Sequence, residues 1–266
     1  MSNQSLSLLQ RAEELKLLGL VSHWNELTDL SLIENILQWE ELARKNYGLE
    51  RRLKNSHIGR FKPLSQFDWS WPRKCDQKAI CEIMGLDFIS TSTNVVLCGP
   101  NGVGKSMIAC NIAHQSIIRG FNALFITASK MLNDLASQDG DIALQRKLRK
   151  YSAPNVLIID EVGYLSYSDR HADLLFEIIS RRYEQKPTII TTNKPFAEWN
   201  QIFKSAACVV SMVDRLVHNS EIISIDADSY RLKEAEENST KRAQSRKSQT
   251  KKKTSEKIEK TDEVQP

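Results

Sequence analysis

The segment 99–106, which reads GPNGVGKS, constrains the fold more than any other part of this 266-residue chain. Its glycines allow backbone N–H groups to turn inward onto phosphate groups. An apolar run at 94–98 precedes the segment, and 103–119 follows it with the pattern of a helix, whose N-terminus favours anions. This order predicts an α/β domain with a phosphate-binding loop. The expected ATP-binding residues are Gly99, Pro100, Asn101, Gly102, Val103, Gly104, Lys105 and Ser106.

A second motif at 156–161, VLIIDE, has the pattern of a buried strand that ends in two carboxylates. In such loops the lysine, here Lys105, reaches the β- and γ-phosphates, and the hydroxyl of Ser106 binds Mg²⁺. We expect Asp160 to hold Mg²⁺ together with Ser106, and Glu161 to orient and deprotonate the attacking water. A loop-capping role for Glu161 is the alternative. Because kinases of small molecules often lack the second acid, the pair favours an ATPase.

Three further polar residues are candidates for the site. Asn193 ends an apolar run at 188–192 and lies 33 residues after Asp160, which would direct its side chain toward the γ-phosphate; a turn signal is the alternative. Arg215 lies on a predicted helix and either reaches the γ-phosphate of a neighbouring subunit or pairs with Asp214 on the surface. For Arg231, the residues alone leave a functional role and a surface role equally open.

Apolar, β-branched runs alternate with helical patterns through the middle of the chain, which predicts a parallel sheet covered on both faces. Before it, residues 1–62 have helical spacing, with Gly19 expected to end a first helix and a capping box at 31–34 expected to open a second, through about Lys54. Trp69 and Trp71 are expected to pack against the core; stacking on bases is the alternative. The polar residues 232–266 are expected to be disordered. The strands are expected at 95–98, 123–127, 156–160, 188–192 and 221–225, and the main helices at 76–90, 103–119 and 170–183.

Positive charge is concentrated in two regions, although the net charge of the chain is only +4. Residues 44–62 carry seven Lys/Arg and one Glu, and residues 240–266 carry nine Lys/Arg and four Asp/Glu. This distribution indicates a polyanionic partner; a solvated helix face and a solubilising tail are the alternative. The residues expected to contact the phosphates of duplex DNA are Arg44, Arg51, Arg52, Lys54, Arg60 and Lys62.

No apolar stretch is long enough to span a membrane, and the first ten residues lack the layout of a signal peptide. The five cysteines form no CxxC pair and are expected to be reduced, buried residues. These features predict a cytoplasmic protein without a membrane partner.

The segments GPNGVGKS, VLIIDEVGYL, LFEIISRRYE, TIITTNKPFAEW, DRLVH and SYRL, in this order, resemble the AAA+ ATPases of the IstB family, the helper proteins of insertion-sequence transposition. The resemblance extends over nearly the whole chain. It implies an AAA+ core at 76–231 with a five-stranded parallel sheet, preceded by a helical DNA-binding domain at 1–62 and a connector at 63–75. Because only the polar residues 232–266 follow Arg231, we expect the helical lid of AAA+ proteins to be absent or reduced.

The resemblance also implies roles and partners. Asn193 would be the sensor residue, Arg215 the arginine that acts on the neighbouring subunit, and Arg231 a second sensor arginine. Family members assemble with ATP on duplex DNA as homo-oligomers and stimulate a partner transposase. The related DnaC and DnaI proteins suggest helicase loading as the alternative function, and a small-molecule kinase is a further class that Glu161, Asn193 and Arg215 argue against.

Overall fold

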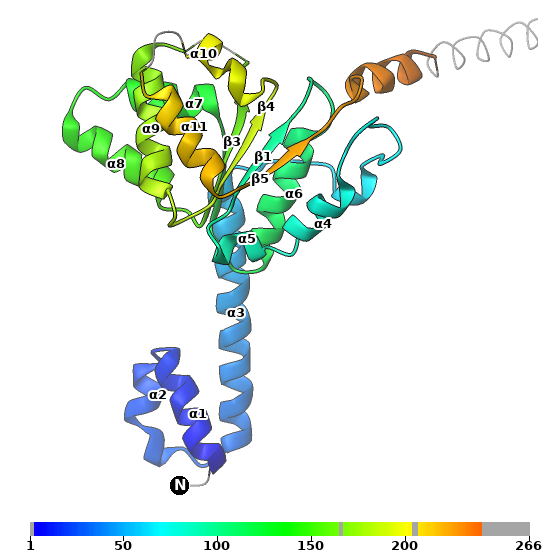
Figure 1. Ribbon diagram of the computed structural model, residues 1–266. Helices are drawn as coiled ribbons and strands as arrows, with labels where there is room; N and C mark the ends of the chain where they lie inside the picture. The colour runs from blue at the N-terminus through cyan, green and yellow to red at the C-terminus, as the bar shows by residue number, and fades with distance from the viewer. Residues whose placement is uncertain (1–2, 165–166, 204–206, 241–266) are drawn as a thin grey trace, which may run out of the picture.

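The structure is a computed structural model that describes residues 3–164, 167–203 and 207–240. Within these residues, five parallel strands form one sheet in the order β2-β3-β4-β1-β5 (Figure 1). The predicted parallel sheet is therefore confirmed; β3 extends two residues beyond the expected end, and β5 begins and ends one residue early. The strands are β1 (Asn94–Cys98), β2 (Ala123–Thr127), β3 (Val156–Val162), β4 (Thr188–Thr192) and β5 (Ser220–Ser224).

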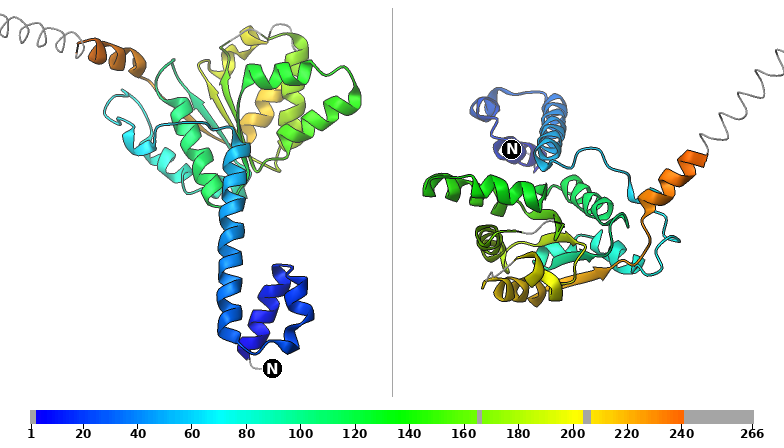
Figure 2. Two further views of the ribbon diagram at one scale, coloured as in Figure 1. Left: turned by 180° about the vertical axis from the view of Figure 1, so that it is seen from behind. Right: turned by 90° about the horizontal axis from the view of Figure 1, so that it is seen from above.

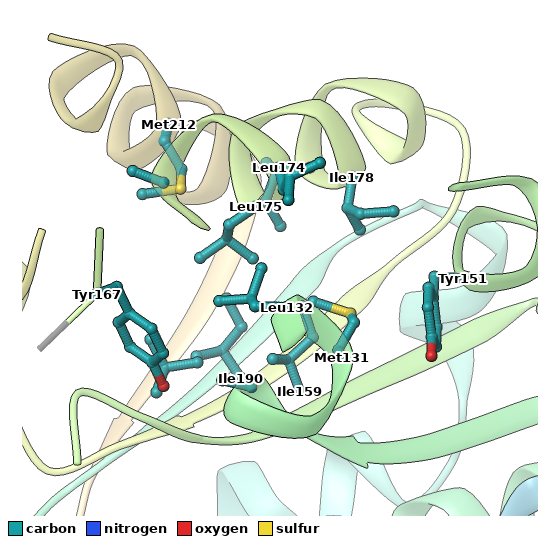
Figure 3. Close-up of a cluster of buried hydrophobic side chains, with 14 of the residues drawn as sticks. Met131, Leu132, Tyr151, Ile159, Tyr167, Leu174, Leu175, Ile178, Ile190 and Met212 are labelled. Carbon is teal, nitrogen blue, oxygen red and sulfur yellow. The ribbon is translucent and has the colours of Figure 1, made fainter. Parts of the chain in front are cut away.

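Helices cover both faces of the sheet because successive side chains of a buried strand point to opposite sides. In β3, Leu157 and Ile159 belong to one apolar core, part of which Figure 3 shows, and Val156 and Ile158 belong to the other. The first core includes α7 (Ala128–Ala136), α8 (Asp141–Ser152), α9 (Asp169–Arg182), α10 (Trp199–Ile202) and α11 (Val209–His218). The second includes α4 (Gln77–Ile83), α5 (Asp87–Ser90) and α6 (Lys105–Ile118).

Two expected helices have different bounds for reasons of backbone geometry. The helix expected at 76–90 is divided into α4 and α5, because Leu86 between them adopts a left-handed φ of 73°. The helix expected from residue 103 begins at Lys105, because Gly104 has a φ of 99° and cannot be helical. Trp69 and Trp71 are partly buried against the second core, as expected, whereas Cys81 on α4 is exposed and only Cys110 is fully buried.

The N-terminal helices form a small separate bundle at one end of α3 (Leu30–Ser56), which projects from the core in Figure 1 and in the left view of Figure 2. Leu8, Trp24 and Leu37 are at the centre of the bundle. A bidentate pair between Arg11 and Glu41, at 2.9 Å for each contact, also joins the first helix to α3. The other end of α3 packs against α6 and β2. The bundle contains α1 (Asn3–Glu14), α2 (Leu18–Ser22) and the 3₁₀ turn η1 (Trp24–Glu26).

Two sequence expectations in this bundle are wrong. The N-cap of α3 is Asp29, whose carboxylate accepts a hydrogen bond from the Leu32 N–H at 3.0 Å, so 31–34 is not the capping box. Gly19 lies inside α2; α1 ends earlier because Lys16 adopts a left-handed φ of 55°.

The expectation of disorder is wrong for residues 232–240, which form a helix that starts at Tyr230. Two ion pairs hold this helix: Lys233 pairs with Asp68 of the connector at 3.2 Å, and Glu234 pairs with Lys62, just before the connector, at 2.5 Å. The remainder of the tail, residues 241–266, lies outside the described residues. The connector itself contains the 3₁₀ turn η2 (Leu64–Gln66), and a second turn, η3 (Phe196–Glu198), precedes α10.

Candidate nucleotide-binding site

The phosphate loop between β1 and α6 has a geometry that requires glycine. Gly102 and Gly104 adopt φ angles of 81° and 99°, which are unfavourable for residues with a Cβ. A Cβ on Gly104 would lie 2.5 Å from Cε2 of Phe67, and a Cβ on Gly99 would lie 2.2 Å from the Ile225 carbonyl oxygen. The loop is therefore a tightly packed backbone cradle at the start of a helix, as an anion site requires.

Lys105 lies within this loop and is buried, with 4% of its surface exposed. Its Nζ donates hydrogen bonds to the carbonyl oxygens of Gly99 at 2.7 Å and Pro100 at 2.6 Å. Burial lowers the pKa of Lys105 from its ordinary value. An ammonium group whose partners are neutral carbonyls gains from an anion at this position, which fits a nucleotide phosphate.

The two carboxylates at the end of β3 lie beside the loop. Ser106 Oγ donates to Asp160 Oδ1 at 2.8 Å, so the two expected Mg²⁺ ligands are in direct contact. Thr191 Oγ1 on β4 donates to the same oxygen at 2.5 Å. The next residue, Glu161, adopts a left-handed φ of 64°, and its N–H donates to Thr191 Oγ1 at 2.9 Å.

Asn193 lies next to the turn that follows Glu161. A Cβ on Gly163, whose φ is 97°, would lie 3.1 Å from Asn193 Oδ1. That oxygen is buried and has no hydrogen-bond partner among the described residues. Because a buried polar atom is costly unless it is paired, Asn193 Oδ1 is well placed to bind a group that enters the site.

A cavity of about 360 Å³ opens above the phosphate loop, and it has walls from distant parts of the chain. Trp71 and Tyr230 contribute aromatic rings with centroids 5.9 Å apart, and the Tyr230 N–H donates to the Gly102 carbonyl at 3.1 Å. Arg231 lines the cavity too, so the structure brings this expected residue to the phosphate loop of its own chain. The other walls include Phe67, Tyr164, Met107 and Glu234.

Sequence reasoning missed several residues of this site. Thr191 lies in a run of β-branched residues whose pattern indicates only a buried strand. Phe67, Tyr164 and Tyr230 come from segments that no local pattern joins to the loop. Sequence reasoning singled out Arg231 but gave no indication that its neighbour Tyr230 belongs to the site.

Arg215 does not belong to this group of residues. It lies on α11, shortly before the start of β5, whereas the phosphate loop follows the end of β1 in the same parallel sheet. Its guanidinium carbon lies 4.6 Å from the centre of the Phe176 ring, and it donates a hydrogen bond to Ser180 Oγ on α9. The structure therefore does not bring Arg215 to the phosphate loop of its own chain.

The six basic residues expected to contact DNA are not brought together as one group. Arg44 pairs with Glu40 on α3 at 2.6 Å. Lys62 lines the nucleotide cavity and pairs with Glu234 at 2.5 Å. On the helix and just after it, Arg51, Lys54 and Arg60 are exposed, and Arg52 is half-buried.

Comparison with known proteins identifies the family. Residues 4–238 match the sequence model of the IstB-like ATP-binding proteins. The chain belongs to this family. It is 34% identical over 224 residues to a Geobacillus stearothermophilus protein named as an ATP-binding protein of insertion sequence IS5376, covering 81% of this chain and 89% of that protein.

A second relative of this IstB-like protein is the Pseudomonas aeruginosa protein named as an ATP-binding protein of insertion sequence IS21, with 37% identity over 198 residues, 74% of this chain and 75% of that one. The crystal structure of DnaI is similar in fold, with a TM-score of 0.52 and 20% identity over 65% of this chain and 91% of that chain. The expected AAA+ fold and family are thus confirmed. No helix in the described part of the chain is long and apolar enough to cross a membrane.

The residues of this IstB-like protein fit Mg²⁺. Hydroxyl and carboxylate oxygens are the donors that Mg²⁺ prefers, and Ser106 and Asp160 present both at the phosphate loop. The described residues contain no group of three or more His, Cys, Asp or Glu side chains that could hold a metal alone.

Proposed function

We propose that this IstB-like protein binds Mg²⁺·ATP and hydrolyses it. One observation carries the proposal: Lys105 and Ser106 of α6, Asp160 and Glu161 of β3, and Asn193 directly after β4 meet at one edge of the sheet. The family shares ATP binding; hydrolysis is our inference from the second carboxylate and from Asn193.

In this proposal each side chain has one role. Lys105 exchanges its bonds to Gly99 and Pro100 for phosphate oxygens, and the backbone N–H groups of the loop bind the remaining charge. Mg²⁺, when bound by Ser106 and Asp160, supplies neutralisation of phosphate charge. Glu161 accepts the proton of the attacking water, and Asn193 Oδ1 orients that water. Arg231, in the same cavity, adds positive charge beside the phosphates.

Substitution of the loop lysine tests nucleotide binding. Lys105→Ala should abolish ATP binding, measured by calorimetry, and phosphate release, because it removes the ground-state contact to the phosphates. Lys130→Ala is the matched control, since Lys130 is an exposed lysine on α7 outside the site. Parental affinity in Lys105→Ala would exclude this loop as the nucleotide site.

We further propose that the protein assembles with ATP on duplex DNA in the cytoplasm and assists a transposase. The support is the association of its relatives with insertion sequences, together with the basic residues of α3 and the segment after it. Arg44, Arg51, Arg52, Lys54 and Arg60 would bind phosphates, and Arg215 would act on the neighbouring subunit. Assembly would place many weakly binding helices on one DNA, which gives avidity.

Charge reversal on α3 tests this second proposal. Arg51→Glu combined with Lys54→Glu should weaken duplex binding in ATP and reduce the slope of log affinity against log salt by roughly 0.9 for each lost phosphate contact. Lys78→Glu, on α4 and 89% exposed at its side chain, is the control. Equal salt slopes in both variants would remove α3 from the DNA interface.

A further inference from the structure

The junction of β3 and β4 contains an irregularity at the proposed catalytic edge. Ile159 pairs with Ile190, and the next paired residues are Val162 and Thr192. Two residues of β3, Asp160 and Glu161, therefore lie opposite the single residue Thr191 of β4. An insertion of this kind is a β-bulge, which bends the strand and redirects the side chains that it contains.

The hydroxyl of Thr191 binds both residues of the bulge. It donates to Asp160 Oδ1 at 2.5 Å and accepts the Glu161 N–H at 2.9 Å. Thr191 is only 1% exposed, so these protein groups, rather than bulk solvent, satisfy its hydroxyl. A hydroxyl has one donor hydrogen and can accept in the same geometry, which makes it suited to this double role.

Both contacts concern groups that need to be held in place. Asp160 also accepts a hydrogen bond from the Ser106 hydroxyl, and Ser106 and Asp160 are the two proposed Mg²⁺ ligands. Thr191 also donates to Asp160 but is not a proposed ligand, so it can hold Asp160 in place without binding the metal. Glu161 has a φ of 64°, a conformation that costs free energy for a residue with a side chain. The hydrogen bond from its N–H to Thr191 favours that conformation over a relaxed, extended one.

We propose that Thr191 is a positioning residue that couples the Mg²⁺ ligand Asp160 to the water-activating residue Glu161. The inference rests on the proposed function of the site. It gives Thr191 no contact with nucleotide: the residue acts by orienting a metal ligand and the backbone of a general base. Loss of such a supporting hydrogen bond typically costs about 10- to 100-fold in metal affinity or activity.

Two substitutions of Thr191 and one control separate this role from simple packing. Thr191→Val keeps the shape and removes the hydroxyl, and Thr191→Ser keeps the hydroxyl and removes the methyl group. Thr188→Val is the matched control: Thr188 is on the same strand, is 2% exposed, and accepts a hydrogen bond from Arg182 Nε at 3.0 Å, far along β4 from the bulge. Any general effect of losing a buried threonine hydroxyl from β4 should appear in this control.

The readouts are the Mg²⁺ concentration that half-saturates the thermal stabilisation by ADP, the affinity for ADP in EDTA, and kcat and KM for ATP. We expect Thr191→Val to raise the Mg²⁺ midpoint about 10-fold or more and to lower kcat by a similar factor or more, with KM and the affinity in EDTA within about twofold. Thr191→Ser should stay within about threefold of the parent in every readout. Thr188→Val should lower the melting temperature without changing the Mg²⁺ midpoint.

The outcomes separate the two levels of the proposal. A Thr191→Val protein with the parental Mg²⁺ midpoint and kcat overturns the role of Thr191 and leaves the proposed ATPase intact. Equal losses in Thr191→Ser and Thr191→Val also overturn it, because the hydroxyl would then not be the group that matters. If Thr191→Val does not fold, a Thr191→Ser protein with a changed Mg²⁺ midpoint contradicts the role and an unchanged midpoint supports it. A parental protein whose melting temperature does not respond to Mg²⁺ and ADP refutes the proposed function itself.

Discussion

Substitution of Gly104 by alanine is the most direct test of the backbone geometry of the phosphate loop. Gly104 has a φ of 99°, and its Cβ would lie 2.5 Å from Cε2 of Phe67, a contact that requires the ring or the loop to move. A left-handed conformation costs about 1–2 kcal/mol for a residue with a Cβ, before any displacement of the ring. If the loop relaxes to avoid this strain, the cradle of N–H groups that binds the phosphates is lost. A loss of about 1–2 kcal/mol in binding free energy then corresponds to an affinity loss of about 5- to 30-fold.

Calorimetric titration with ADP and Mg²⁺, together with thermal unfolding, measures both consequences. We expect Gly104→Ala to lose at least about 5-fold in affinity, to lose stability, or both, with a combined cost of at least about 1 kcal/mol. Gly19→Ala is the control, because nothing lies within 4 Å of its Cβ position and its φ is not positive. Parental affinity and parental stability in Gly104→Ala would refute the account of this loop.

Three other predictions concern the role of Arg215 and the buried thiol of Cys110. Arg215→Ala and Lys105→Ala proteins should each be inactive alone and regain ATP turnover when mixed, because the Lys105→Ala subunit can supply its Arg215 to the intact loop of an Arg215→Ala subunit. If confirmed mixed assemblies show no recovery, Arg215 does not act on a neighbouring subunit, and only its contact with Phe176 remains. Burial raises the pKa of Cys110 to about 12, so at pH 8 a thiol reagent should modify the exposed Cys81 long before Cys110. Because an unfolded thiol ionises near pH 9 and the folded one near 12, raising the pH from 8 to 10 should lower the unfolding free energy of the parent more than that of Cys110→Ala; equal losses would contradict the shift.

The local features of the core could be predicted from the sequence because they have local causes. The glycines and Lys105 of the phosphate loop have a fixed spacing, and the buried β-branched runs define the strands to within two residues. The paired carboxylates at the end of β3 follow from the same reasoning. These are the parts of the site whose chemistry depends on neighbours in the sequence.

The parts that escaped prediction depend on contacts between distant segments. The bulge opposite Thr191 follows from the pairing of two strands, which the pattern of neither strand reveals. The pair between Lys62 and Glu234 joins residues 172 positions apart in the chain, so the local charge pattern could not predict it. The helix at 230–240 has a polar composition that suggests disorder, and its ion pairs with Lys62 and Asp68 could not be predicted from that composition.

The central claim is that this edge of the sheet hydrolyses ATP, and Glu161→Gln tests it most directly. The measurement is phosphate release by the parent and by Glu161→Gln, with bound ATP quantified in the same samples, in Mg²⁺ and duplex DNA. The account predicts that the parent releases phosphate continuously. It predicts that Glu161→Gln binds ATP within a few-fold of the parent but releases phosphate at least about 100-fold more slowly, since only the water-activating group is lost. Turnover by Glu161→Gln at the parental rate, or no release by the parent, would contradict the account.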